Sequence, residues 1–172
     1  MDTEIGMGKS ARRAYGFDEV SIVPSRRTRD PDDVDISWEL DAWRFDLPLM
    51  ASAMDAVVSP DSAIEVGRLG GLAVLNLEGL WTRYDDPVPV LERIAEATPA
   101  EATKVLQDVY DEPIKAELIT QRIREIKAGG GVASASLTPQ RVQEFEKDVL
   151  AGELDILVIQ GTVVSAEHVS QT

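Results

Sequence analysis

Residues 49–60, LMASAMDAVVSP, join a short apolar run to two residues that commonly start a helix. The run that contains them, from Leu47 to Met54, is nearly continuous and short, which predicts a strand covered on both faces. Ser59 and Pro60 are then typical of the N-cap and of the first helical position. This stretch therefore predicts a strand that passes directly into a helix.

The same succession of strand and helix signals continues along the chain. Apolar runs at Leu72 to Leu77, Val132 to Leu137 and Leu154 to Gln160 predict three more strands. Helical periodicity fills the interval between Leu80 and Lys127, and Thr138 with a following proline marks the start of another helix. Short apolar strands that alternate with helices predict a parallel α/β sheet, either a barrel or an open doubly wound sheet.

Apolar side chains at helical spacing predict the buried faces of the helices. Thr98 with Glu101 also predicts a capping box for a helix that carries Val105, Leu106 and Val109. The other predicted apolar faces consist of Ile64, Val66 and Leu69; of Ile114, Leu118, Ile119, Ile123 and Ile126; and of Val142, Phe145, Val149 and Leu150.

Residues 1–45 are predicted to form an irregular lead-in, and residues 46–172 to hold the first strands and helices of one domain. Within the lead-in, strands are predicted at Val20 to Val23 and at Val34 to Leu40, on either side of a charged turn. The stretch GMGKS at residues 6–10 lacks the earlier glycine of a phosphate-binding P-loop and follows no predicted strand. We interpret it as a flexible tail.

The charge and the apolar content narrow the classes of partner. Lys and Arg number 17 against 31 Asp and Glu, and the net charge of -14 repels both phosphate backbones and anionic lipids. We therefore expect no nucleic-acid partner and no membrane partner. The N-terminus lacks the apolar segment of a signal peptide, and no run approaches the ~18 apolar residues of a membrane span, so we expect a cytoplasmic protein.

The chain contains no cysteine and one histidine. Without cysteine it can build no disulfide framework, no thiolate metal site and no cysteine nucleophile of its own. His168 lies in a polar segment with no second ligand nearby, so we interpret it as a solvated surface residue and predict no metal site.

Polar residues directly after two of the predicted strands are the candidate binding residues. In parallel α/β folds, ligands bind at the carboxyl ends of the strands. These positions are held by Ser52, Met54 and Asp55 after the first strand of the sheet, and by Gln160, Gly161 and Thr162 after the last.

Each candidate also has a plain structural alternative. Asp55 could cap the following helix or pair with Arg68, and Met54 could fill the core. The residues from Gln160 to Thr162 could form a simple turn. No G-x-G-x-x-G motif follows any predicted strand, which disfavours a Rossmann-type dinucleotide site and leaves the barrel as the favoured architecture.

Several segments, in order, resemble the IMP dehydrogenase/GMP reductase family. The most specific is DLPLMASAMDAVVSP at residues 46–60, which is similar to the family's P-hydrophobic-S-x-MDTV motif after the first barrel strand. The further segments are FDEVSIVPS at 17–25, GRLGGLAVL at 67–75, VASASL at 132–137 and AGELDILVIQGT at 151–162. The similarity spans nearly the whole chain.

The resemblance implies the fold and the activity of a longer parent protein. The fold would be a TIM (β/α)8 barrel, which takes eight strands and about 250 residues, and this chain would be its N-terminal portion with about four βα units. The activity would be the oxidation of IMP to XMP with NAD in guanine nucleotide synthesis. The nucleophilic cysteine is expected beyond Thr172, so the isolated chain is expected to be inactive.

The resemblance also assigns roles to the candidate residues. Ser52 and Met54 would touch IMP or another purine nucleotide, and Asp55 would support their loop. Gln160, with the Gly161 and Thr162 that follow it, would face the cofactor, NAD or NADP, because it stands where the family usually has an aspartate near the nicotinamide ribose. The family further implies a homo-tetramer and, in the full-length protein, a monovalent cation such as potassium.

Two departures from the family pattern leave other functions open. About fifty mostly helical residues fill the interval in which typical IMP dehydrogenases insert a pair of regulatory CBS modules, so no CBS insertion is predicted. Gln160 replaces the usual aspartate. The alternatives are a GMP reductase that uses NADPH, whose opening the stretch VPSRRT at 23–28 resembles, and a non-catalytic relative that binds purine nucleotide.

Overall fold

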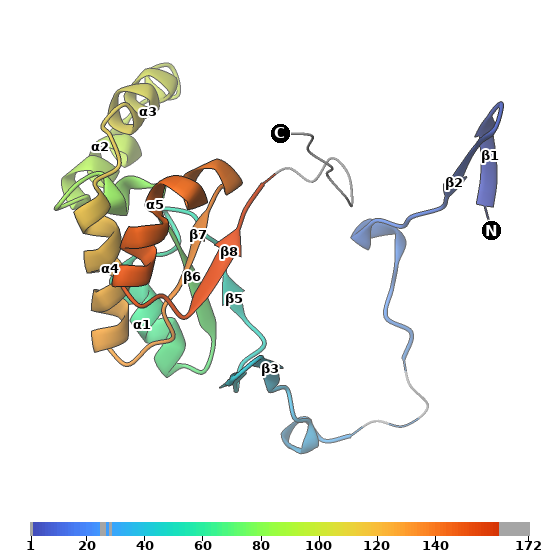
Figure 1. Ribbon diagram of the computed structural model, residues 1–172. Coiled ribbons are helices and arrows are strands. Elements are labelled where there is room, and N and C mark those ends of the chain that lie inside the picture. Colours follow the sequence, from blue (N-terminus) through green and yellow to red (C-terminus); the bar gives the residue numbers. More distant parts are fainter. Residues whose placement is uncertain (1, 25–26, 28, 162–172) are drawn as a thin grey trace. The chain divides into compact units, whose positions relative to one another are not determined.

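The computed structural model describes residues 2–24, 27 and 29–161, and the chain divides into two compact units, Met1–Asp35 and Ile36–Thr172. The first unit starts with an antiparallel hairpin of β1 (Asp2–Gly6) and β2 (Lys9–Arg12) (Figure 1). Two short 3-10 turns follow, η1 (Phe17–Glu19) and η2 (Pro31–Asp33).

Two predictions for the lead-in are wrong. The GMGKS stretch is not a tail, because it contains the turn of the hairpin, where Gly8 adopts a φ of +68° that glycine tolerates. Val20 to Val23 form neither a strand nor a helix, and the side chains of Val20, Ile22 and Val23 are exposed. Their β-branched composition is not enough for a strand where no neighbouring strand pairs with them in the part of the unit that is described.

The second unit begins with another antiparallel pair, β3 (Trp38–Leu40) and β4 (Trp43–Phe45). The rings of Trp38 and Phe45 stack with their centroids 4.6 Å apart, and the Trp38 indole N–H donates to the Leu47 carbonyl at 2.9 Å. The strand predicted from Val34 to Leu40 therefore exists only over its last three residues.

Four parallel strands form the sheet of the second unit, in the order β5 (Met50–Ala51), β6 (Leu72–Asn76), β7 (Ser134–Leu137) and β8 (Ile156–Ile159). Each strand pairs with the next one along the chain, so that Leu75 lies opposite Ala135 and Ala135 opposite Leu157. The predicted parallel α/β sheet is confirmed. Because the strand order never reverses, it is the order of consecutive barrel units and not that of a doubly wound sheet.

Helices connect the strands and pack on one face of the sheet (Figure 1). α1 (Pro60–Arg68) follows β5, α4 (Ala116–Ala128) precedes β7, and α5 (Pro139–Ala151) precedes β8. Between β6 and α4 the chain forms η3 (Leu80–Thr82), α2 (Val88–Glu96) and α3 (Ala102–Tyr110). None of the helices in the described part of the chain has the length and apolar character needed to cross a membrane.

The predicted helix starts at Ser59 and Thr138 are confirmed. The Ser59 hydroxyl accepts a hydrogen bond from the Ser62 N–H at 3.0 Å, and a proline is the first residue of both α1 and α5. Thr98 and Glu101 also bond to each other, since the Thr98 hydroxyl donates to the Glu101 carboxylate at 2.6 Å just before α3 begins.

The hydrophobic core lies between the sheet and the helices α1, α4 and α5, with Ile119 and Ala135 among its fully buried members. Leu69, Leu106 and Leu150, which were predicted to be buried, are exposed. Leu69 is the C-cap of α1, beyond its last turn. Leu150 follows the buried Val149 and so points about 100° away from it around the helix.

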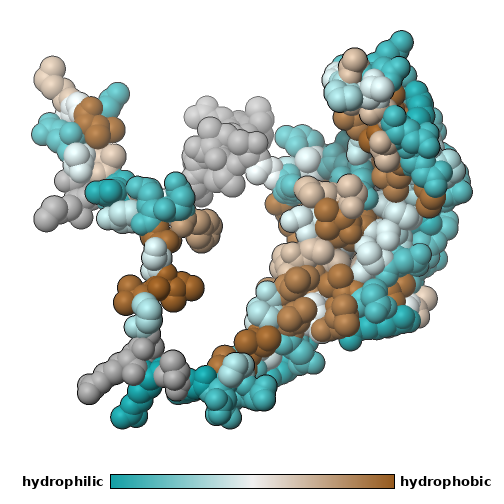
Figure 2. Space-filling view, turned by 180° about the vertical axis from the view of Figure 1, so that it is seen from behind, coloured by the Kyte–Doolittle hydropathy of each residue, from teal (hydrophilic) through white to brown (hydrophobic). Residues whose placement is uncertain are grey.

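β5 is shorter and more exposed than predicted. Only Met50 and Ala51 of the predicted strand from Leu47 to Met54 pair with β6, and Met50 is 51% exposed. β5 is an edge strand of the described sheet, so no neighbour covers its outer side, and Ile159 is exposed on the opposite edge strand. Figure 2 shows apolar residues gathered on the surface of the second unit.

Arg122 of α4 is buried, with 6% of its surface exposed, and it joins α4 to the segment after β6. Its Nε donates to the Trp81 carbonyl at 3.0 Å, and its Nη2 donates to the Tyr84 and Asp85 carbonyls at 3.3 and 2.6 Å. Its Nη1 lies 3.0 Å from both carboxylate oxygens of Glu125. One side chain therefore pairs with three backbone carbonyls and fixes the η3 segment against the core.

Arg122→Met should lower the free energy of unfolding by about 3 kcal/mol or more, because three carbonyls lose their donor and Glu125 loses its cation. Arg124→Met is the matched control, because Arg124 is exposed on the same helix and donates to the Ala151 carbonyl at 2.8 Å. The control should cost less than about 1 kcal/mol. Urea denaturation followed by circular dichroism measures both changes, and equal losses would contradict the role assigned to Arg122.

Candidate functional site

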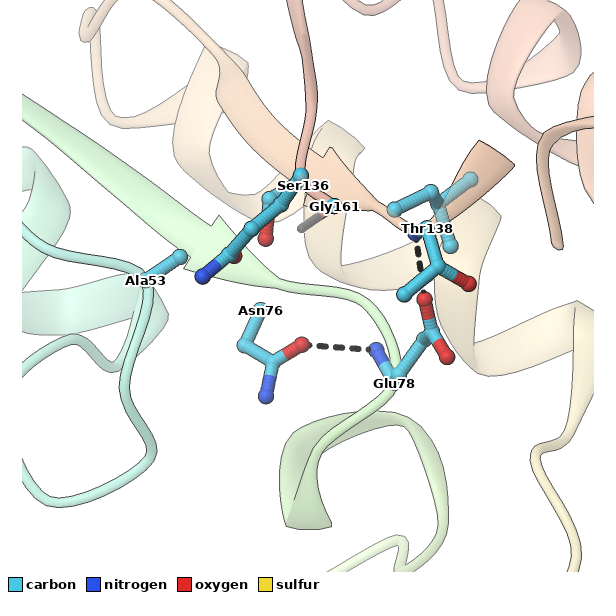
Figure 3. Close-up of a pocket in the computed structure, with 8 residues that line it drawn as sticks. Ala53, Asn76, Glu78, Ser136, Thr138 and Gly161 are labelled. Carbon is cyan, nitrogen blue, oxygen red and sulfur yellow. Dashed lines mark hydrogen bonds between the residues drawn. The ribbon is translucent and has the colours of Figure 1, made fainter. Parts of the chain in front are cut away.

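A pocket with a volume of about 450 Å³ opens at the carboxyl ends of the four parallel strands (Figure 3). Every strand of the sheet contributes to its wall. The lining residues are Ala53 after β5, Asn76 and Glu78 at and after the end of β6, Ser136, Leu137 and Thr138 at the end of β7, and Gln160 and Gly161 after β8. The pocket lies where a parallel α/β fold is expected to bind ligands.

Glu78 joins the ends of β6 and β7 (Figure 3). Its backbone N–H donates to Asn76 Oδ1 at 3.0 Å, and its carboxylate accepts a hydrogen bond from the Thr138 N–H. Its other carboxylate oxygen lies 3.9 Å from the Arg141 guanidinium of α5. The pocket therefore contains an acidic side chain whose charge is partly offset, while none of the lining residues in the described chain is cationic.

Ser134 and Ser136 of β7 are buried, and neither hydroxyl has a hydrogen-bond partner among the described residues. They alternate with Ala135 and Leu137, which pack in the core. Ser136 also lines the pocket, and because an unpaired buried hydroxyl is unfavourable, it is a candidate partner for a polar group of a ligand. Sequence analysis missed this residue, although serine alternating with alanine in VASASL is a visible signal.

Two predicted site residues of the first loop lie beside the pocket. Ser52 and Met54 are exposed on either side of the lining residue Ala53, and they are not part of the pocket wall. Their contact with a nucleotide stays a prediction. The alternative that Met54 fills the core is wrong, because this side chain is exposed.

The predicted residues after the last strand fall in and beyond the pocket. Gln160 and Gly161 line it, and the Gln160 N–H extends the sheet by donating to the Leu137 carbonyl at 2.9 Å. Thr162 and His168 lie outside the described residues. Within the described part of the chain, no group of three acidic or histidine side chains is arranged to hold a metal ion.

Asp55 connects the loop after β5 to the segment after β6. Its Oδ2 accepts hydrogen bonds from the Leu80 N–H at 3.1 Å and from the Tyr110 hydroxyl. Its Oδ1 is buried against Gly79, where an added Cβ would lie only 1.8 Å from it. Both structural alternatives are therefore wrong, since Asp55 neither caps α1 nor pairs with Arg68, which bonds within α1.

The surroundings of Tyr110 raise the pKa of its hydroxyl far above the ordinary value of 10.0. Partial burial is the largest cause, followed by the hydrogen bond to Asp55 and the charge of that carboxylate, while the Arg83 guanidinium offsets part of the rise in pKa. The raised pKa keeps the hydroxyl protonated, and so able to donate to Asp55, further into the alkaline range than an ordinary tyrosine. The pKa of Tyr110 is higher in the folded than in the unfolded protein. The contribution of its protonated hydroxyl to folding stability is therefore fully present below the unfolded-state pKa and is lost as pH rises through the folded-state pKa.

Comparisons with known proteins agree with one another. Residues 14–171 match the family model described as the IMP dehydrogenase / GMP reductase domain. An uncharacterised oxidoreductase of Mycobacterium tuberculosis is 45% identical over 172 residues, which cover 97% of this chain and 46% of that protein. The inosine-5'-monophosphate dehydrogenase of Methanocaldococcus jannaschii is 39% identical over 66 residues, which cover 38% of this chain and 13% of that protein.

A solved structure shares the fold. The crystal structure of an IMP dehydrogenase/GMP reductase-like protein from Corynebacterium glutamicum matches with a TM-score of 0.85 at 43% identity, over 98% of this chain and 46% of that one. The predicted fold, the N-terminal portion of a TIM barrel, is thereby confirmed. The chain spans about half the length of the curated relatives it matches over its whole length.

Asp55→Asn should lower the pKa of Tyr110 toward its ordinary value, because the substitution removes the carboxylate charge but keeps an oxygen that can accept the hydrogen bond. The burial persists, so the pKa should remain above that value. Tyrosinate absorbance during alkaline titration measures the change, and Tyr110→Phe identifies the part of the curve that belongs to Tyr110. Coinciding curves for the unsubstituted and Asp55→Asn proteins would show that the contact is absent.

Proposed function

The chain belongs to the IMP dehydrogenase/GMP reductase family, and on this premise we propose that it forms part of the ligand site of an oxidoreductase that converts IMP to XMP with NAD. The observation that carries the proposal is the pocket at the strand ends, to which all four strands contribute polar or small residues. The oxidoreductase class is that of the relatives that match the whole chain.

The pocket suits the uncharged parts of a nucleotide. The unpartnered Ser136 hydroxyl and the side-chain amide of Asn76 can pair with ribose hydroxyls and with the edge of a purine. The Glu78 carboxylate would repel a phosphate. We therefore assign the base and the ribose to this pocket, and the phosphate to a part of the barrel outside it.

The pocket also has the groups that a nicotinamide ribose requires. NAD, when bound, would accept the hydride that leaves the purine. The Gln160 side-chain amide can both donate to and accept from a hydroxyl of this ribose. Unlike the aspartate usual in the family, the Gln160 amide carries no charge that would repel a 2′-phosphate, so NADP is compatible with it as well.

The residues of this chain would bind and orient the substrate. The 172 residues include no cysteine, so the thiolate that attacks the purine would come from outside them. Holding the purine in line with that thiolate and with the nicotinamide would remove much of the entropic barrier to the reaction. The isolated chain would therefore show no turnover.

Gln160 supports one alternative within the same family. A GMP reductase would run in the reductive direction with NADPH, whose additional phosphate an amide tolerates better than a carboxylate does. The other alternative is a protein that binds purine nucleotide without catalysis, and such a protein would need no cysteine nucleophile.

Kinetics of the full-length protein test the proposal. We expect NADH to form when IMP and NAD are supplied, and we expect the isolated chain of residues 1–172 to form none under the same conditions. Consumption of NADPH with GMP would favour the reductase, and binding of IMP without turnover would favour the non-catalytic relative. If no purine nucleotide binds, the proposal is wrong.

Gln160→Asp should raise the preference of the full-length protein for NAD over NADP by roughly tenfold, because a carboxylate bonds more strongly to ribose hydroxyls and repels a 2′-phosphate. Gln143→Asp is the matched control, because Gln143 is exposed on α5 and lies outside the pocket wall. Apparent affinities for the two cofactors measure the effect. Identical shifts in both variants would mean that Gln160 does not contact the ribose.

A further inference from the structure

The segment between β6 and α4 contacts the loop after β5 and its own pocket residue Glu78. Its helix α3 ends at Tyr110, whose hydroxyl donates to Asp55 of the β5–α1 loop, which we define as residues 52–59. Its residue Arg83 donates from Nε and Nη2 to the carbonyl of the pocket residue Glu78, at 3.2 and 3.1 Å. Through Tyr110 this segment contacts the loop after β5, and through Arg83 it holds the backbone of Glu78 at the end of β6.

The β5–α1 loop has few bonds that tie it to the rest of the unit. Its backbone bonds are local, with the Met54 N–H donating to the Ser52 carbonyl at 2.8 Å and the Val57 and Val58 N–H groups donating to the Met54 carbonyl at 2.9 Å. Such bonds shape the loop, and the buried side chain of Val58 anchors its end in the hydrophobic core. The side chain of Asp55 ties the middle of the loop to the rest of the unit, because its carboxylate bonds to groups 25 and 55 positions away in the sequence.

Three groups enclose the Asp55 carboxylate. The Leu80 N–H and the Tyr110 hydroxyl both donate to Oδ2, and Gly79 leaves no room beside Oδ1 for even one more carbon atom. These contacts together fix the position of the Asp55 carboxylate. The ring of Tyr110 is itself held, since the Arg83 guanidinium lies 5.6 Å from its centroid.

We propose that Tyr110 is a positioning residue of the nucleotide site. By holding Asp55, it fixes the β5–α1 loop in the conformation in which Ser52 and Met54 meet the ligand, so binding does not have to order that loop. The segment from α2 to α3 would then contribute to ligand binding by holding the loop after β5 in position. The identity of the ligand in this inference rests on the proposed function. The ordering of the loop by Tyr110 does not depend on the proposed function.

Hydrogen exchange of the full-length protein without any nucleotide tests the ordering of the loop. In Tyr110→Phe, which loses only the hydroxyl, the amides of Met54, Val57 and Val58 should exchange faster. Tyr84→Phe is the matched control, because its hydroxyl donates to the Val109 carbonyl at 2.9 Å in the same segment but does not touch Asp55. Unchanged loop exchange in Tyr110→Phe, or equal acceleration in both variants, would overturn the inference.

Titration with IMP tests the consequence for binding. Tyr110→Phe should weaken IMP binding by about three- to tenfold, the usual effect of one lost hydrogen bond, while Tyr84→Phe should leave it unchanged. In turnover, KM for IMP should rise in Tyr110→Phe with little change in kcat, because a disordered loop weakens binding and leaves the chemical groups in place. A loss confined to kcat would contradict a positioning role.

A second variant reaches Asp55 from the other side. Gly79→Ala would place a Cβ 1.8 Å from Asp55 Oδ1, so the carboxylate must move away from the Tyr110 hydroxyl, and the same increase in loop exchange and in KM is expected. Combining Gly79→Ala with Tyr110→Phe should add little to either effect, because both break one contact. Fully additive effects would overturn the inference.

The two hypotheses fail in different ways. If the loop exchange responds as expected but the unsubstituted protein binds no IMP, the proposed function is wrong and the ordering of the loop by Tyr110 is upheld. If IMP binds equally well to all the variants although the loop exchanges faster, the proposed function stands and Tyr110 is not a positioning residue.

Discussion

The buried guanidinium of Arg122 is the contact on which the geometry of the site depends. The chain leaves the end of β6 through η3, and three carbonyls of this connection accept their hydrogen bonds from Arg122 of α4. Because α4 is anchored in the core by Ile119 and Ile123, the connection inherits that rigid position. Leu80 lies inside it, and its N–H sets the place of Asp55. A charge buried on α4 thus helps to fix the loop that follows β5.

The sheet could be predicted from the sequence because buried parallel strands consist of unbroken apolar runs. Leu72 to Leu77 and Val132 to Leu137 are such runs, and each contains an observed strand. The same rule failed for Leu47 to Met54, since an edge strand has an apolar sequence but lacks a neighbour on one side. It could not find the hairpin at Gly8 either, because polar strands on both sides of a turn show no apolar run.

The site was only partly predictable for a related reason. Gln160 and Gly161 were found because position after a strand is a local property of the sequence. Ser136 has a local signal, the alternation with alanine, but nothing in the sequence says that its hydroxyl lacks a partner. The role of Tyr110 could not be found, because its partner Asp55 is 55 positions away and only the folded chain brings them together.

The contacts of α3 differ in kind from those of a module that is attached only by flexible linkers. A linker transmits little force, because its backbone can rearrange at small cost. Here Tyr84 bonds to Val109, Arg83 to Glu112 and Tyr110 to Asp55, across 25, 29 and 55 positions of sequence. All three bonds involve residues at or just after the end of α3, so a shift of α3 would have to move Asp55 or break the hydrogen bond between Tyr110 and Asp55. Helix α3 therefore supports the pocket through Asp55, although α3 itself contributes no residue to the pocket wall.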